Sequence, residues 1–196
     1  MKRRGNFFVL CALLTVCGMT ALAQGGSCSA KVPRDLADQL LRQAFKSMET
    51  PQDEQEKITR DAEKMKGGVA GLFCAESVDL DRDGKADLLI HQADVEGAFC
   101  GAHNCPVWVY RRTNDGYTML LEDTGGYLSP IEALKTSTNG YRDIRTMQQS
   151  SAVEHEITVF KFDGKKYRAR VCTTEKYAGK RRGKDRFTYL THKCGQ

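Results

Sequence analysis

Four aspartates crowd into nine consecutive residues of this chain, and their spacing is that of a calcium-binding loop. Carboxylates this close repel one another unless a cation gathers them. Ca²⁺ is suited to that role, because it is a hard ion that takes about 6–8 oxygen ligands in irregular geometry. Counted from Asp79, Gly84 falls at the sharp turn of position 6, and Lys85 at position 7 offers a backbone carbonyl. We therefore expect Ca²⁺ ligands at Asp79, Asp81, Asp83, Lys85 and Asp87.

The residues after this string distinguish it from an EF-hand. Position 12 is Ile90 instead of the bidentate glutamate, and 86–90 is strand-like and apolar or small apart from Asp87. The string D-x-D-x-D-G-x-x-D-L resembles the loops of FG-GAP or VCBS-type sequences, as in integrin-α propeller blades, where it joins two β-strands. In a single copy, the resemblance implies a calcium-holding β-hairpin and no propeller.

The ion expected here is structural, because no nucleophile or base is arranged around the loop in the sequence. Without a carboxylate at position 12 the affinity should be modest, although millimolar extracellular calcium would still fill the site. The alternative is an acidic, solvated turn that binds no ion.

The first 23 residues have the features of a cleavable secretory signal peptide. Residues 2–4 are basic, Phe7–Leu22 is a run of apolar or small residues, and Ala21–Ala23 is a small-x-small cleavage site. The apolar core is shorter than the roughly 20 residues that a membrane span needs. We expect a secreted or periplasmic protein, cleaved near Ala23 and without a membrane span.

Six of the eight cysteines follow the signal peptide, and an even number in an exported chain predicts a disulfide framework. Cys100 and Cys105 are the easiest local pair, whereas the sequence does not choose among the other pairings. The remaining bridges would tie the N-terminal segment and the C-terminus to a sheet. The six candidates are Cys28, Cys74, Cys100, Cys105, Cys172 and Cys194.

The remaining chain, 24–196, is almost neutral, with 27 basic and 25 acidic residues, so its bulk charge indicates no particular partner. Basic residues cluster in 176–186, where Gly179 and Gly183 favour an exposed, solvated loop. The alternative for this cluster is contact with acidic polymers such as lipid phosphates, cell-wall glycans or nucleic acid. No nucleic-acid-binding motif is present.

Hydrophobic periodicity predicts an α+β fold, with one or two N-terminal helices followed by an antiparallel β-meander sheet. The helices are expected at 33–48 and 51–66, within a helical segment 24–68. From residue 69 the period changes to two, which predicts a β domain over 69–196; we expect 24–196 to fold as one unit. The expected strands are 71–78, 87–93, 106–112, 117–122, 131–136, 142–149, 154–162, 165–173 and 186–192.

Two sharp turns, at 114–116 and 163–164, predict hairpins, because Asn-Gly and Asp-Gly pairs supply positive φ. In the second hairpin we expect Val159, Phe160 and Phe162 to face Tyr167, Ala169 and Val171.

Other chemistry is weakly indicated. His103 lies between Cys100 and Cys105, but in an oxidising compartment a disulfide is a better use of those thiols than zinc. His155 and the preceding serines 150–151 lack the context of a nucleophile elbow. Aromatic residues on the strands could stack on glycans, although half-buried core positions are the simpler interpretation: Trp108, Tyr110, Tyr117 and Tyr127.

Three functions remain open from the sequence. The first is a non-enzymatic exported domain that binds a protein or glycan. The second is an inhibitor or immunity-type protein against an extracytoplasmic hydrolase. The third is a hydrolase with a site assembled from distant residues. Neither the partner nor the oligomeric state can be read from the sequence.

Overall fold

The structure of the chain is a computed structural model that describes residues 28–93, 99–100, 105–123 and 131–194. The expected signal peptide, 1–23, and its cleavage point near Ala23 lie outside these residues. Within them, no helix is long and apolar enough to cross a membrane.

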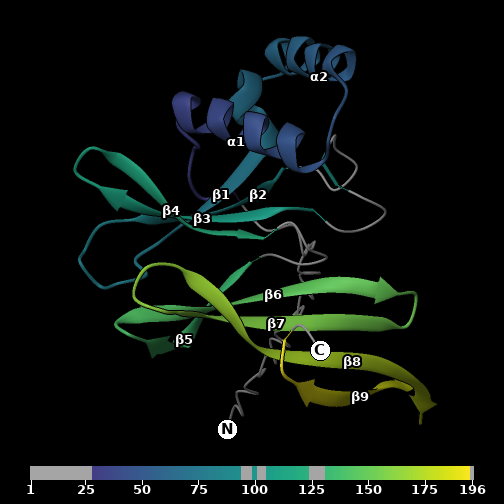
Figure 1. Cartoon of the computed structure of the whole chain (residues 1–196). Coiled ribbons are helices and arrows are strands. Elements are labelled where there is room, and N and C mark those ends of the chain that lie inside the picture. The colour runs from purple at the N-terminus through teal and green to yellow at the C-terminus, as the bar shows by residue number, and fades with distance from the viewer. Residues whose placement is uncertain (1–27, 94–98, 101–104, 124–130, 195–196) are drawn as a thin grey trace, which may run out of the picture.

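The described part of the chain forms three layers (Figure 1). The helices are α1 (Arg34–Ser47), α2 (Gln52–Lys64) and the 3-10 helix η1 (Gly68–Leu72). The first sheet holds β1 (Phe73–Val78), β2 (Asp87–Gln92), β3 (Val107–Thr113) and β4 (Gly116–Asp123). The second sheet holds β5 (Glu132–Thr138), β6 (Tyr141–Ser151), β7 (Glu154–Phe162), β8 (Tyr167–Arg181) and β9 (Lys184–His192).

The expectation of one meander sheet is corrected by this arrangement. The strands form two antiparallel sheets, each of them a meander in chain order, and the helices and the second sheet cover opposite faces of the first (Figure 1). The first sheet is therefore buried on both faces, as the unbroken burial of Leu88, Leu89 and Ile90 shows. The helices followed by antiparallel strands confirm the α+β class.

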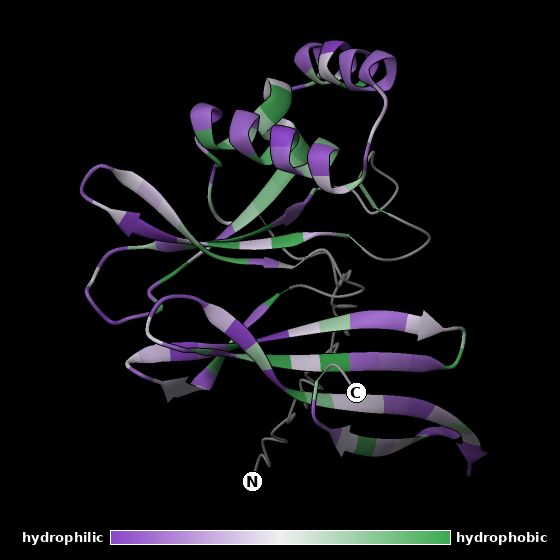
Figure 2. Cartoon of the chain, in the orientation of Figure 1, coloured by the Kyte–Doolittle hydropathy of each residue, from purple (hydrophilic) through white to green (hydrophobic). Residues whose placement is uncertain are grey.

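The helix α1 packs on the first sheet through the apolar stripe that its sequence predicts. Leu36, Leu40 and Phe45 are buried in the same core as Phe73 and Trp108 of the sheet. The second helix, α2, is largely hydrophilic, and Figure 2 shows hydrophilic residues along it. The helices form one layer of the molecule, and α1 buries one face in the core that it shares with the first sheet.

A second core lies between the two sheets. It joins Leu89 and Val109 of the first sheet to Ile144 and Phe160 of the second. Leu80, which comes from the acidic loop between β1 and β2, is fully buried in this core. The loop is thus attached to both sheets.

The expected facing of residues in the β7–β8 hairpin is confirmed. Val159 lies opposite Val171, Phe160 opposite Ala169, and Phe162 opposite Tyr167. The alternation of apolar residues and the Asp-Gly turn together determine this register.

Residues 176–186 do not form the exposed loop that their composition favours. They continue β8 and β9 as a hairpin whose two-residue turn is Arg182–Gly183, with φ values of 52° and 77°. Positive φ at both central residues matches the twist of a tight β-hairpin, so the strands extend to the turn.

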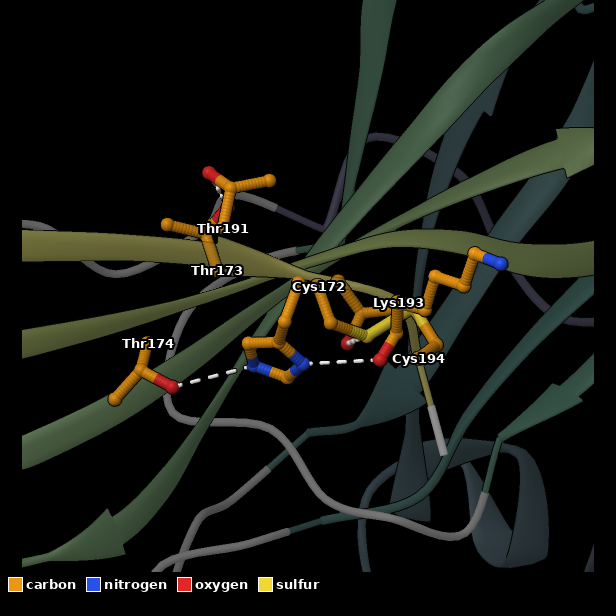
Figure 3. Close-up of a disulfide and its surroundings, with 8 residues drawn as sticks. Cys172, Thr173, Thr174, Thr191, Lys193 and Cys194 are labelled. Carbon is orange, nitrogen blue, oxygen red and sulfur yellow. Dashed lines mark hydrogen bonds between the residues drawn. A yellow bond between two sulfur atoms is a disulfide. The ribbon is translucent and has the colours of Figure 1, made fainter. Parts of the chain in front are cut away.

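All six cysteines of the described chain are paired. The bridges join Cys28 to Cys74 and Cys100 to Cys105, and a third joins β8 to the segment after β9. Figure 3 shows this last bridge, Cys172–Cys194. The three disulfides fit an oxidising location outside the cytosol.

Candidate metal centre

The acidic string joins β1 to β2, and its own side chains shape it. The Asp79 carboxylate accepts a hydrogen bond from the backbone N–H of Gly84 at 3.1 Å. Asp81 likewise accepts from Asp83 at 3.2 Å. Gly84 has a φ of 82°, where a residue without a Cβ is favoured. Alternating aspartates therefore fold the loop back on itself.

Three carboxylates of the string converge. One oxygen from each of Asp79, Asp81 and Asp87 lies within 4.8 Å of the other two. A metal ion could lie between these three carboxylates. Among the described residues, they are the one set of acidic, histidine or cysteine side chains arranged in this way.

One of the expected side-chain ligands, Asp83, stands apart from this group. The Asp83 side chain is exposed and accepts a hydrogen bond from the Lys85 N–H at 2.8 Å. The Lys85 ammonium reaches Asn114, in the turn between β3 and β4, at 3.0 Å. The structure thus brings positions 1, 3 and 9 together and leaves position 5 outside.

One oxygen of the cluster is both buried and without a partner. Asp79 Oδ1 has almost no contact with solvent and makes no hydrogen bond to the described residues. Burial of a carboxylate oxygen without a donor is costly, because it loses hydration and gains nothing in exchange. A cation among the three aspartates would supply the missing interaction.

Asp87 is the most deeply placed of the three, with 1% of its surface exposed. Its two oxygens accept hydrogen bonds from the backbone N–H groups of Leu80, at 3.1 Å, and Arg112, at 2.8 Å. Burial raises the pKa of Asp87 above its ordinary value, and the nearby charges of Asp81 and Asp83 raise it further, while the two backbone donors oppose the shift. The carboxylate is thus held in place but electrostatically disfavoured, a condition that a bound cation reverses.

The loop connects the two sheets through Leu80. The Leu80 side chain is buried between them, and its carbonyl accepts a hydrogen bond from the N–H of Arg142 on β6 at 2.8 Å. Asp79 and Asp81 flank this residue. An ion held by these aspartates would therefore fix the point where the first sheet meets the second.

Two residues beside the cluster were not found from the sequence. The hydroxyl of Tyr141, on β6, accepts a hydrogen bond from Arg111 at 2.8 Å, and burial together with the nearby Asp81 raises the pKa of Tyr141. The hydrogen bond to Tyr141 raises the pKa of Arg111, and the charges of Asp81 and Asp87 raise it further. Arg111 thus offsets part of the negative charge. Its residue type and its place on β3 give no sequence signal of this role.

Among the described residues, the other candidates lie in separate pairs and turns. His155 pairs with Glu175 at 3.3 Å on neighbouring strands, and Ser151 accepts a hydrogen bond from the Val153 N–H within its own turn. Two grooves border α2, of about 680 and about 390 Å³, and the residues that line them include no histidine, cysteine or serine.

The proposed zinc and glycan sites gain no support among the described residues. The Cys100 and Cys105 thiols are joined in a disulfide, and His103 lies outside the described residues. Trp108 and Tyr110 are each 1% exposed, so they belong to the core and offer no ring to a glycan. Tyr127 also lies outside the described residues.

Compared with family models, with curated proteins and with solved structures, the chain has no match.

Proposed function

We propose that the protein is an exported, non-enzymatic binding domain in which the loop between β1 and β2 holds a structural Ca²⁺. The signal-peptide features of residues 1–23 and the three disulfides support export. The periplasm or the external medium then provides the oxidising surroundings that the bridges need.

The convergence of Asp79, Asp81 and Asp87 within 4.8 Å, with a buried Asp79 oxygen that lacks a donor, carries the calcium proposal. Oxygen ligands alone favour Ca²⁺ or Mg²⁺ over the softer metals. Ca²⁺ is preferred because it tolerates irregular coordination, whereas Mg²⁺ demands a near-ideal octahedron and retains its waters. The resemblance to FG-GAP or VCBS-type loops supports the same ion and adds Asp83 and the Lys85 carbonyl as further ligands.

The role proposed for the ion is to fix the position of the first sheet relative to the second. The neighbouring Leu80 is buried between the sheets and hydrogen-bonded to β6. A nucleophile or a general base beside the aspartates is lacking among the described residues, so the ion is assigned no catalytic step.

A protein or a glycan outside the cytosol remains the proposed class of partner. The first sheet has both faces covered, so among the described residues the face of the second sheet turned away from the first is the sheet face left for binding.

Thermal unfolding with and without calcium tests the proposal. The chain beginning at Gln24, with its disulfides formed, should unfold at a higher temperature in CaCl₂ than in EDTA, because a ligand bound only by the folded state stabilises it. At ten times the Kd the gain is about 1.4 kcal/mol, which raises the Tm of a domain of this size by about 3–5 °C. MgCl₂ at the same concentration should give a smaller rise.

Asp81→Asn is the variant of choice, because Asp81 is a proposed ligand but is less buried than Asp87. It should abolish the calcium-dependent rise. Asp115→Asn, in the exposed turn after β3, removes the same charge and should leave the rise intact. An equal Tm in CaCl₂ and EDTA for the wild type, or a rise that survives Asp81→Asn, would contradict the proposal.

A further inference from the structure

The β8–β9 hairpin extends beyond the strands beside it. The last residue of β8 that pairs with β7 is Lys176, opposite Glu154 at the start of β7. The Tyr177 N–H still donates to the Val153 carbonyl in the β6–β7 turn at 2.8 Å, and beyond it β8 pairs with β9. Figure 1 shows the β8–β9 hairpin, whose residues 174–190 are hereafter the arm, at the lower right, on the side away from the helices.

The turn of the arm concentrates positive charge. Residues 180–186 contain five basic residues and one acidic one, a net charge of +4, whereas the rest of 24–196 carries −2. Lys180 lies 3.8 Å from Asp185, and the other four basic side chains make no ion pair with the described residues. Figure 2 shows the end of the hairpin as hydrophilic. The basic tip consists of Lys180, Arg181, Arg182, Lys184 and Arg186.

Large apolar side chains stand exposed directly behind the basic tip. Phe187 is 42% exposed, Tyr189 62% and Leu190 68%. Phe187 packs edge-on against Tyr177, with ring centroids 5.8 Å apart. Because successive residues of a strand point to opposite faces, Phe187 and Tyr189 share one face of β9 and Leu190 lies on the other. Each face of this edge strand therefore carries an exposed apolar side chain behind the basic tip.

A disulfide and side-chain hydrogen bonds join the two strands of the arm at its base, the end away from the basic tip. The disulfide Cys172–Cys194 joins β8 to the segment after β9, and the hydroxyls of Thr173 and Thr191 lie 3.1 Å apart (Figure 3). The His192 ring bonds Thr174 at 3.3 Å. An arm already ordered by these contacts loses little conformational entropy when it binds.

We propose that the arm binds the surface of an anionic phospholipid bilayer. The basic tip contacts lipid phosphates, and Phe187, Tyr189 and Leu190 enter the headgroup region, where amphipathic aromatic rings are stable. Charge and apolar insertion together give firmer attachment than either alone. Leu190 favours a bilayer over a soluble polyanion, because an aliphatic side chain cannot stack on a sugar or base but gains free energy in hydrocarbon.

This inference rests on the exported location in the proposed function and uses no residue of the calcium loop. Its failure and the failure of the calcium site are therefore separable. Vesicle binding is measured in EDTA as well as in CaCl₂, and it should be retained in EDTA. A protein that shows a calcium-dependent Tm but no vesicle binding overturns the inference alone.

The first test measures flotation of the chain from Gln24 with vesicles of phosphatidylcholine, with and without an equal part of phosphatidylglycerol. Every core residue follows Cys28, so this chain keeps both cores. It should bind only the anionic vesicles, and less at high salt. The triple variant Arg181→Gln, Arg182→Asn, Lys184→Gln should weaken binding roughly 100-fold, at about tenfold or less per charge. Asn is chosen at Arg182 because it tolerates the positive φ there.

A matched triple variant, Lys46→Gln, Lys57→Gln, Lys66→Gln, removes the same charge from the helical layer, where all three lysines are exposed and lack an ion pair with the described residues. It should bind anionic vesicles like the wild type. Equal weakening by both triple variants would overturn the inference, because net charge and not the arm would then control binding.

The second test separates a bilayer from a soluble polyanion. The variant Tyr189→Ser, Leu190→Ser keeps every charge and should weaken vesicle binding about tenfold or more, because it removes the apolar contact. Unchanged vesicle binding, together with equally tight binding of polyphosphate by wild type and variant, would mean that the arm takes a soluble polyanion. Pairing of β9 edges into a dimer, detected by light scattering without vesicle binding, would likewise overturn the inference.

Discussion

Asp87 accepts a hydrogen bond from the backbone N–H of Arg112 at 2.8 Å, which joins an acid of the β1–β2 loop to the neighbouring strand β3. The second oxygen of the same carboxylate accepts from Leu80 at 3.1 Å. Asp87 is therefore both a proposed ligand and a structural part of the sheet, whereas Asp81, its partner in the cluster, accepts its backbone hydrogen bond from Asp83 within the loop. Substitutions at the two positions should differ in a measurable way.

Asp87→Asn should destabilise the protein even in EDTA. The amide offers one acceptor where the carboxylate offers two, so one buried N–H loses its partner at a cost of about 1–3 kcal/mol. Urea unfolding measures this cost. Asp81→Asn in the same conditions should have a much smaller effect, and equal effects of the two variants in EDTA would show that the hydrogen bonds of Asp87 do not stabilise the sheet.

Arg111→Gln should tighten calcium binding. Arg111 donates a hydrogen bond to Tyr141 at 2.8 Å, which raises its pKa, and the charges of Asp81 and Asp87 raise it further, so its guanidinium repels a cation placed between these aspartates. Its removal should lower the Kd about three- to tenfold, measured by calorimetric titration. Arg112→Gln is the control, because the Arg112 side chain is exposed and points away from the cluster in the alternating strand. A weaker affinity in Arg111→Gln would place the ion elsewhere.

Leu80→Ala should be among the more destabilising substitutions in the acidic loop. The side chain is fully buried between the sheets, and a Leu→Ala change at such a site costs about 2–5 kcal/mol. Leu190→Ala makes the same chemical change at a side chain that is 68% exposed, and it should cost less than about 0.5 kcal/mol. Urea unfolding of both variants is the measurement. Similar, small costs would mean that the loop is not anchored between the sheets.

Asp163 gives a pH dependence of known sign. Backbone N–H groups of Lys166 and Lys165, with the Arg168 side chain, lower the pKa of Asp163 from 3.8 to about 2. A lowered folded-state pKa stabilises the folded protein above the unfolded-state pKa, and this contribution is lost as the pH falls toward about 2. Asp163→Asn should therefore lower the Tm near pH 7.

The Tm difference between wild type and Asp163→Asn should shrink between about pH 4 and about pH 2. A difference that stays constant over this range would show that the charge of Asp163 contributes nothing.

The strands and the β7–β8 register could be predicted because their determinants are local. Alternating apolar residues and the turn at Asp163–Gly164 lie within a few residues of the positions they determine, and the observed pairing of Phe162 with Tyr167 follows from them. The helix α1 is predictable for the same reason, since its apolar stripe recurs at helical spacing.

The split into two sheets depends on contacts between distant residues and was not predictable. Trp108 and Tyr110 alternate with Val107 and Val109 on β3, and all four are buried, because helices cover one face of the strand and the second sheet covers the other. A sequence with both faces apolar does not say what covers each face. In the sequence, Leu80 is one residue of an acidic string. In the structure, its side chain anchors the loop between the sheets.

The candidate site was predictable in part. The spacing of the aspartates predicts that Asp79, Asp81 and Asp87 meet, as they do, but it also predicts a ligand at Asp83, whose exposed side chain lies outside the group. It gave no information on Arg111 and Tyr141, which reach the cluster from β3 and β6. The basic residues and glycines of 176–186 favour a loop, because both are common in loops, whereas the positive-φ turn at Arg182–Gly183 permits a hairpin.

A crystal structure of the chain grown in about 5 mM CaCl₂, with anomalous data, tests the central claim most directly. The account predicts an anomalous peak between Asp79, Asp81 and Asp87, with carboxylate oxygens at about 2.3–2.6 Å and Asp79 Oδ1 among them. The same crystals with no peak there, and with Asp79 Oδ1 bonded to water or to a protein donor, would contradict it.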